Sequence, residues 1–269
     1  MQTFGYKVFI KSLSDSATIV ERALRDDRPI EVGFDVDAND EVEHYLRSTL
    51  PHHSKSVNTH LDSSFNVFTV QRKLNDLHVE FERAVLLGSD YSIMHASRQP
   101  MTLRREHWPR LMDQFGRDLE CIQAVCEEFD HELYVENSFH SIEFYEALFE
   151  QVDVRGLSRI QLCFDFGHAK VWSNQSLSDW LAFLGRQQRK GRKLHFHLHA
   201  NSGLKDEHLS FVEVQQLGLS GPDSYLGDRD YFSALDCIRE RFPISRKVFE
   251  VKAIFALENM DLVMSYFAA

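Results

Sequence analysis

The chain has 269 residues, of which 43% are hydrophobic and 12% aromatic, so it has enough apolar mass for a large buried core and is not a disordered protein. Its 41 Asp and Glu outnumber its 30 Lys and Arg, and the formal net charge of -11 excludes the broad basic surface that sequence-independent nucleic-acid binding requires. No apolar run approaches the roughly 18 residues of a membrane helix, and the first residues lack the layout of a signal peptide. We therefore expect a cytoplasmic protein that does not contact a membrane.

Short strand-like runs alternate with amphipathic helical runs along the whole chain, which is typical of parallel strands joined by crossover helices. Eight segments are predicted as strands: 6–12, 29–36, 55–62, 91–96, 132–138, 159–168, 193–200 and 247–252. The predicted helices are 16–25, 71–87, 107–129, 141–151, 176–188, 231–241 and 256–267. Eight such repeats, in a chain of the length that a barrel needs, predict an α/β fold: a single (β/α)8 TIM barrel that takes up residues 1–269 as one domain.

One predicted connection is unusually long. It runs from Asn201 to about Asp230, contains GLSGPDSYLGD and has weak periodicity. A connection of this length on the carboxyl side of a strand is usually functional or mobile, and is rarely part of the packed scaffold.

Polar residues occupy the ends of the predicted strands, where a barrel of this kind has its active face. Carboxylates in apolar runs such as QLCFDFGH and LYVENS would cost several kcal/mol each to bury, unless a cation compensates them. The four cysteines include no CxxC pair, so a thiolate zinc site is not expected. The candidate ligands at the strand ends and in the loop after the seventh strand are His60, His95, Glu136, Asp165, His168, His197, Asp206, His208 and Glu250.

The seventh strand, KLHFHLHAN, places three histidines on one face by simple alternation. His197 is the best ligand of the three. His195 lies deeper, where a hydrogen-bonded core histidine is expected, and His199 is predicted at the rim, where it supports a ligand or contacts substrate. Asp165 and His168 could reach one metal or two neighbouring metals, and their spacing leaves both arrangements open.

A family resemblance rests on seven segments. THLDSSF, SIMHAS, LYVENS, CFDFGHAKVW, HFHLHAN, KDEHLSF and FEVK occur in this order on or just after the predicted strands. Together they resemble the xylose isomerase-like TIM barrel superfamily, which includes endonuclease IV and sugar (phosphate) isomerases and epimerases. The resemblance spans nearly the whole chain, and LYVENS with FDFGHA is its most specific part. It implies a metal-dependent enzyme.

Within this superfamily the resemblance implies two alternative site designs. The endonuclease IV design holds three metals: one on His60, His95 and Glu136, one on Glu136, Asp165, His197 and Glu250, and one on His168, Asp206 and His208. The isomerase and epimerase design holds one divalent ion on Glu136, Asp165, His197 and Glu250. In that design Glu136 and Glu250 also act as the catalytic proton-transfer bases. Zinc is the expected metal, with manganese or magnesium as alternatives, at one to three ions per chain.

Charge arithmetic separates the two designs. Three divalent ions bring +6 against the four carboxylates of the full set, leaving about +2, which attracts a phosphate ester. One ion against three carboxylates leaves about -1, which suits a neutral sugar carbonyl. Because His60, His95, Asp206 and His208 have no duty in the one-metal design, the sequence favours phosphoester hydrolysis, with sugar isomerisation or epimerisation as the alternative. A third hypothesis is a barrel that keeps the ligands but serves as a binding protein.

Three loops depart from the endonuclease pattern. LDSSFN after His60 does not resemble the stretch that inserts into DNA, ASRQPM follows His95, and LSFVEVQQ after His208 lacks the usual glycine-containing turn. These departures put DNA in doubt as the substrate. We expect a small phosphorylated or sugar-like molecule, and the sequence leaves the oligomeric state open.

Substrate contacts are predicted from positions just beyond the ligands. Arg98, Lys170 and Lys205 could line the mouth of the site and hold an anion, with solvated loop charges as the alternative interpretation. Trp172 could stack on a sugar ring or pack between helices. His199 completes this set as a possible substrate contact.

Overall fold

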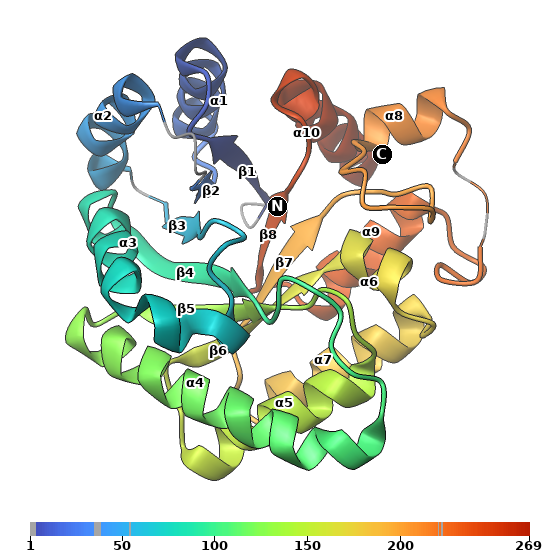
Figure 1. Ribbon diagram of the computed structural model, residues 1–269. Helices are drawn as coiled ribbons and strands as arrows, with labels where there is room; N and C mark the ends of the chain where they lie inside the picture. Colours follow the sequence, from blue (N-terminus) through green and yellow to red (C-terminus); the bar gives the residue numbers. More distant parts are fainter. Residues whose placement is uncertain (1–3, 35–38, 54, 220, 222) are drawn as a thin grey trace.

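The computed structural model describes residues 4–34, 39–53, 55–219, 221 and 223–269 (Figure 1). In these segments each strand pairs in parallel with the next, and the eighth pairs back with the first, so the sheet is a closed barrel. The strands are β1 Phe4–Phe9, β2 Ile30–Gly33, β3 Val57–His60, β4 Ser89–His95, β5 Glu132–Glu136, β6 Ile160–Asp165, β7 Leu194–Leu198 and β8 Arg246–Phe249. The predicted (β/α)8 barrel is confirmed. Residues 35 and 36 of the second predicted strand lie outside the described residues.

Helices form a ring around the strands, and α1 and α10 lie side by side next to β1 (Figure 1). They are α1 Leu13–Arg25, α2 Asp40–Thr49, α3 Leu74–Leu86, α4 Trp108–Glu128, α5 Ile142–Arg155, α6 Phe166–Trp172, α7 Leu177–Arg189, α8 Phe211–Gln216, α9 Tyr231–Arg241 and α10 Ala253–Ala268. Short 3-10 turns are η1 Leu50–His52, η2 Val67–Lys73 and η3 Arg105–His107. All seven predicted helices are present. No helix in the described segments combines the length and apolarity needed to span a membrane.

Three helices were not predicted, each for a local reason. Helix α2 buries only Val42 and Leu46, so its apolar pattern is sparse. Helix α8 has six residues, which is too short to show a period. Helix α6 begins at Phe166, inside the segment predicted as the strand 159–168. The prediction was wrong there because the apolar run continues across a strand-to-helix turn.

That turn is built by two residues of the FDFGH segment. Asp165 ends β6 and caps α6, because its carboxylate accepts a hydrogen bond from the backbone N–H of His168 at 2.6 Å. Gly167 lies under the ring of His199, so closely that a Cβ atom at position 167 would be 2.1 Å from His199 Cε1. The turn therefore requires glycine and directs the His168 side chain back over the barrel.

The two faces of the strands have different chemistry. On β7, Phe196 faces the helices, where its ring lies 5.2 Å from that of Phe242, and the histidines on either side of it face the barrel interior. Large apolar residues pack between strands and helices, whereas the interior holds buried polar residues such as Lys7, Glu31 and Asn58. Barrel interiors of this fold are usually dominated by branched apolar side chains. Here much of the interior is available for polar chemistry.

The long connection after β7 is more ordered than its sequence suggests. Ala200 and Leu209 form an antiparallel bridge, and Asn201 is buried, where its backbone carbonyl accepts a hydrogen bond from the Tyr231 hydroxyl at 2.6 Å. Helix α8 follows, with Ser210 and Glu213 forming a capping box. The first part of the connection is therefore packed scaffold, and residues 220 and 222 lie outside the described chain.

Candidate metal centre

All nine predicted ligands lie at or just beyond the carboxyl ends of the strands and gather into three adjoining clusters. In each cluster the possible ligand atoms lie within 4.8 Å of one another. The first cluster is His60, His95 and Glu136, the central cluster is Glu136, Asp165, His197 and Glu250, and the third cluster is His168, His199, Asp206 and His208. The three sets that the resemblance implied thus come together in space, and the third gains His199.

The central cluster is built around one imidazole nitrogen. His197 Nδ1 lies 3.0 Å from Glu136 Oε1, 3.0 Å from Glu250 Oε2 and 3.9 Å from Asp165 Oδ2. All four residues are buried. Glu250 Oε2 has no hydrogen bond among the described residues, and an unsatisfied buried carboxylate oxygen is costly. Three carboxylates and one imidazole with such an orphaned oxygen fit a divalent cation of the Mn, Mg or Zn type.

The first cluster shares Glu136 with the central one. His60 Nε2 lies 2.8 Å and His95 Nε2 3.5 Å from Glu136 Oε2, the oxygen that does not face His197. His60 Nδ1 lies 2.9 Å from the carbonyl oxygen of Leu61, so this nitrogen donates and Nε2 is left as the ligand atom. Glu136 could therefore bridge two ions through its two oxygens.

The third cluster lies above the turn after β6. Asp206 Oδ2 is 3.3 Å from His168 Nε2 and 2.9 Å from His208 Nε2, while Asp206 Oδ1 has no hydrogen bond in the described chain. The backbone of His208 is left-handed, with φ of 48°, an uncommon conformation for a residue with a side chain. Backbone strain of this kind is concentrated at functional sites. These atoms fit a second or third cation.

The prediction for His199 is corrected by its surroundings. It is fully buried rather than at the rim, and its ring stacks on that of His208 with centroids 4.2 Å apart. His199 Nε2 lies 3.1 Å from Asp165 Oδ2. Because His199 sits between Gly167 and His208, with Nε2 toward Asp165, it can orient Asp165 or bind an ion.

Two further site residues, Lys7 and Glu31, were missed from the sequence. A carboxylate oxygen of Glu31 lies 3.0 Å from His197 Nε2, and Asn58 donates to Glu31 at 2.6 Å. Lys7 Nζ lies 2.6 Å from Glu250 and 3.2 Å from Glu31. Both are buried mid-strand in YKVF and PIEVGF, so the rule that buried charges need partners could have found them. Neither residue is at the carboxyl end of its strand, where the sequence predicted the ligands.

A deeper group, Cys163, His195 and His197, also comes within ligand distance. Burial raises the pKa of the Cys163 thiol well above its ordinary value, and a metal-binding cysteine must be deprotonated. His195 Nδ1 is paired with the Tyr91 hydroxyl at 2.7 Å, as expected for a core histidine. We assign this group no ion.

A cavity of about 350 Å³ opens above the clusters. Trp172 and Arg98 line it, and the Trp172 ring lies 4.4 Å from that of Phe139. Lys170 and Lys205 are not among the lining residues. Lys170 binds Asp223 at 2.6 Å and the Tyr231 hydroxyl at 2.7 Å, because α6 turns it toward α9, and Lys205 is exposed on the loop. The predicted anion-binding role of these two lysines is therefore not supported.

No family model and no curated protein matches this chain. Several solved structures do match this chain. The TTHB071 protein of Thermus thermophilus, from a crystal soaked with ZnCl2, is 19% identical with a TM-score of 0.70 over 98% of this chain and 97% of that one. A D-tagatose 3-epimerase-like protein is 19% identical with a TM-score of 0.73 over 99% and 97%, and a 3-keto-D-glucoside 4-epimerase from E. coli is 11% identical with a TM-score of 0.62 over 98% and 100%. Xylose isomerase domain proteins match as well. The chain has the xylose isomerase-like barrel fold.

The electrostatics of this xylose isomerase-like barrel couple metal binding to proton release. Burial works to raise the pKa values of Glu136 and Glu250, but the imidazoles of His95 and His197 beside Glu136 and the ammonium group of Lys7 beside Glu250 hold them well below their ordinary range. Burial works to lower the pKa values of His168 and His208, but carboxylates raise them to about 10 and about 9. Without a cation these imidazoles are protonated at neutral pH, so an ion must displace their protons.

Proposed function

We propose that the chain is a divalent-metal-dependent isomerase or epimerase that acts on a small unphosphorylated keto sugar. The observation that carries the proposal is the pair Glu136 and Glu250, which reach the same nitrogen of His197 from β5 and β8, each at 3.0 Å. Two carboxylates that flank one position can remove a proton from the carbon beside a carbonyl and return it.

Each residue of the central cluster then has a task. A bound divalent ion supplies polarisation of the substrate carbonyl. Glu136 and Glu250 exchange the proton, since their lowered pKa values keep them as carboxylates, the form that a base requires. Lys7 holds Glu250 Oε1, so Oε2 is the oxygen left for the site. Glu31 accepts from His197 Nε2 and fixes the ring with Nδ1 toward the carboxylates.

The cavity above the site supports a neutral substrate. Arg98 is the one lysine or arginine among its lining residues in the described chain, while Trp172 and Phe139 offer aromatic faces for a sugar ring. Its volume, about 350 Å³, lies at the small end of ligand sites. Similar structures bear the names of sugar epimerases. These points favour the alternative that the sequence had placed second over phosphoester hydrolysis.

Solvent exchange tests the proposal. The chain loaded with Mn or Zn is incubated with keto sugars in D2O, and an epimerase incorporates deuterium at the carbon beside the carbonyl, which proton NMR detects. Glu250→Gln should still bind the sugar but stop exchange. The matched control is Glu258→Gln, an exposed glutamate on α10, which should exchange at the parent rate. Exchange that continues in Glu250→Gln would contradict the proposed role.

Phosphoester hydrolysis remains a second candidate because of one observation: three clusters adjoin and two of them share Glu136, which is more than a one-ion isomerase needs. Including Lys7 and Glu31 does not change the net charge of the site, because their charges cancel. With three divalent ions the net charge is still about +2. Metal analysis separates the candidates. Two or three ions per chain, with loss of one ion and of phosphodiesterase turnover in His208→Ala, favours hydrolysis. One ion per chain, with unchanged deuterium exchange in that variant, favours isomerisation.

A further inference from the structure

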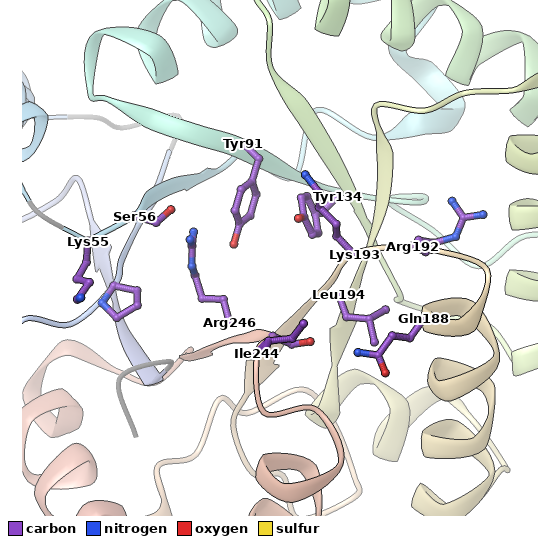
Figure 2. Close-up of a pocket in the computed structure, with 13 residues that line it drawn as sticks. Lys55, Ser56, Tyr91, Tyr134, Gln188, Arg192, Lys193, Leu194, Ile244 and Arg246 are labelled. Carbon is purple, nitrogen blue, oxygen red and sulfur yellow. The ribbon is translucent and has the colours of Figure 1, made fainter.

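A second cavity, of about 630 Å³, lies at the amino-terminal end of the barrel (Figure 2). Pro29, Ser56, Lys193 and Ser245 line it, and each immediately precedes a strand, so the cavity is at the end opposite the metal centre. Catalytic residues of this fold come from the other end. The cavity is therefore separate from the site described above.

The lining of this cavity is cationic. It contains two lysines and two arginines, and none of its described lining residues is an acid, although the whole chain has a net charge of -11. Three of the four cations bind carboxylates that lie outside the lining: Lys55 binds Asp27 at 3.0 Å, Arg192 binds Asp153 at 2.5 Å and Lys193 binds Glu132 at 2.7 Å. Arg246 differs, because its nearest described carboxylate, on Asp90, lies 3.7 Å away. Its guanidinium retains donors for a ligand.

A hydroxyl near Arg246 also lacks a partner. Ser56 Oγ is buried and makes no hydrogen bond to any described residue. Figure 2 shows the Ser56 hydroxyl and the Arg246 guanidinium on one side of Tyr91, and on the other side Tyr134, whose ring centre lies 4.2 Å from that of Tyr91. Buried polar atoms are rarely left unpaired, and a guanidinium beside a hydroxyl matches an oxyanion, which offers acceptors and no donors.

Arg246 is also held in place. Its guanidinium lies 4.9 Å from the centre of the Tyr91 ring, and that ring is fixed by the hydrogen bond from its hydroxyl to His195. A guanidinium on an aromatic face loses less freedom when it binds a planar anion. The lining also includes the apolar side chains of Pro29, Leu194 and Ile244.

We propose that this cavity binds a small organic anion. Its phosphate, phosphonate or carboxylate group accepts hydrogen bonds from Arg246 and Ser56, and its apolar part lies against the apolar side chains of the lining. The inference is independent of the proposed function, because it uses none of the residues of the three clusters.

Calorimetric titration of the metal-loaded chain tests the site with phenylphosphonate, a dianion that carries an apolar ring and has no ester bond to hydrolyse. Methylphosphonate lacks the ring and benzyl alcohol lacks the charge, so both should bind more weakly. Arg246→Met should weaken phenylphosphonate binding at least about tenfold and Ser56→Ala about threefold. Ser56→Ala removes a hydroxyl without a partner in the protein, so it should fold as the parent does. Arg25→Met, at an exposed arginine of α1, is the matched control and should bind as the parent does.

A phosphonate could instead bind ions at the other end of the barrel, and Asp206→Asn distinguishes the two locations. Binding that persists in Asp206→Asn and falls in both Arg246→Met and Ser56→Ala supports the proposal. Parent affinity in those two variants, loss of binding in Asp206→Asn, or no binding to the parent chain overturns it.

Discussion

The two ends of the barrel carry opposite chemistry on the same eight strands. At the carboxyl end, buried carboxylates face imidazoles in three clusters, whereas at the amino-terminal end cations and the unpaired Ser56 hydroxyl line a cavity whose described lining has no acid. A column of polar residues connects the two ends. Tyr91 bonds His195, His195 Nε2 lies 3.3 Å from Glu31, and Glu31 is 3.0 Å from His197. The barrel interior therefore supports the site directly, with charged groups as well as by packing.

The largest effect is expected for Glu136 at the carboxyl end of β5, and Glu132 at the amino-terminal end of the same strand is its comparison. Glu136→Gln replaces one oxygen of a carboxylate that serves two clusters, and we expect loss of bound metal and a fall in turnover of about 1,000-fold. Glu132→Gln breaks only an ion pair with the exposed Lys193 and should change the free energy of unfolding by less than about 1 kcal/mol. Metal analysis and deuterium exchange measure the difference. Equal losses in the two variants would show that the ends are not functionally distinct.

Glu31 tests whether the column supports the metal centre. Glu31→Gln leaves the shape of the side chain but weakens its hold on His197 Nε2, and we expect metal affinity to fall about 10- to 100-fold. Chelator competition measures that affinity. The control is Glu120→Gln on α4, which alters a surface ion pair with Arg155 of α5. Unchanged affinity in Glu31→Gln would mean that His197 is oriented by packing alone.

Gly167 tests the close packing at the carboxyl end. In Gly167→Ala the new methyl group would overlap the His199 ring, and we expect the free energy of unfolding to fall by about 1–3 kcal/mol in urea titrations. Gly185→Ala on α7 is the contrast, because its Cβ would meet only ordinary contacts at 3.5 Å and helix propensity should improve. A Gly167→Ala chain as stable as the parent would show that His199 moves aside freely.

The smallest effect concerns histidine protonation. Outside the clusters, burial of His131 lowers its pKa to about 4, whereas carboxylates raise that of His208 to about 9. Because the pKa of His131 in the folded protein is below its unfolded value of about 6.5, its neutral form contributes stability above pH 6.5, and this stability is lost as the pH falls toward 4. Between pH 7.5 and pH 5, the titration of His131 should lower the free energy of unfolding by about 1–2 kcal/mol. His131→Gln should flatten that slope in urea titrations, and an identical slope would exclude His131 as its source.

Sequence patterns placed the nine candidate ligands at the rim where the structure has them, because parallel strands finish at one rim and inward positions alternate by two. They failed at the turn after β6. The pattern of FDFGHAK predicts strand and loop, but α6 begins at Phe166 and carries Lys170 away from the mouth. A helix rotates each successive side chain by a different angle than a strand does, so an error of three residues in a boundary misplaces every side chain beyond it.

The amino-acid sequence by itself determined the barrel and the nine candidate ligands, since both follow from local periodicity and from the cost of burying charge. Only the tertiary structure decided the partners: Glu31 behind His197, Lys7 beside Glu250, His199 stacked on His208, and the cationic cavity at the far end. The physical reason is that these contacts join strands remote in the chain. Which side chains meet across the interior depends on how far neighbouring strands are staggered when the sheet closes, and no local pattern carries that information.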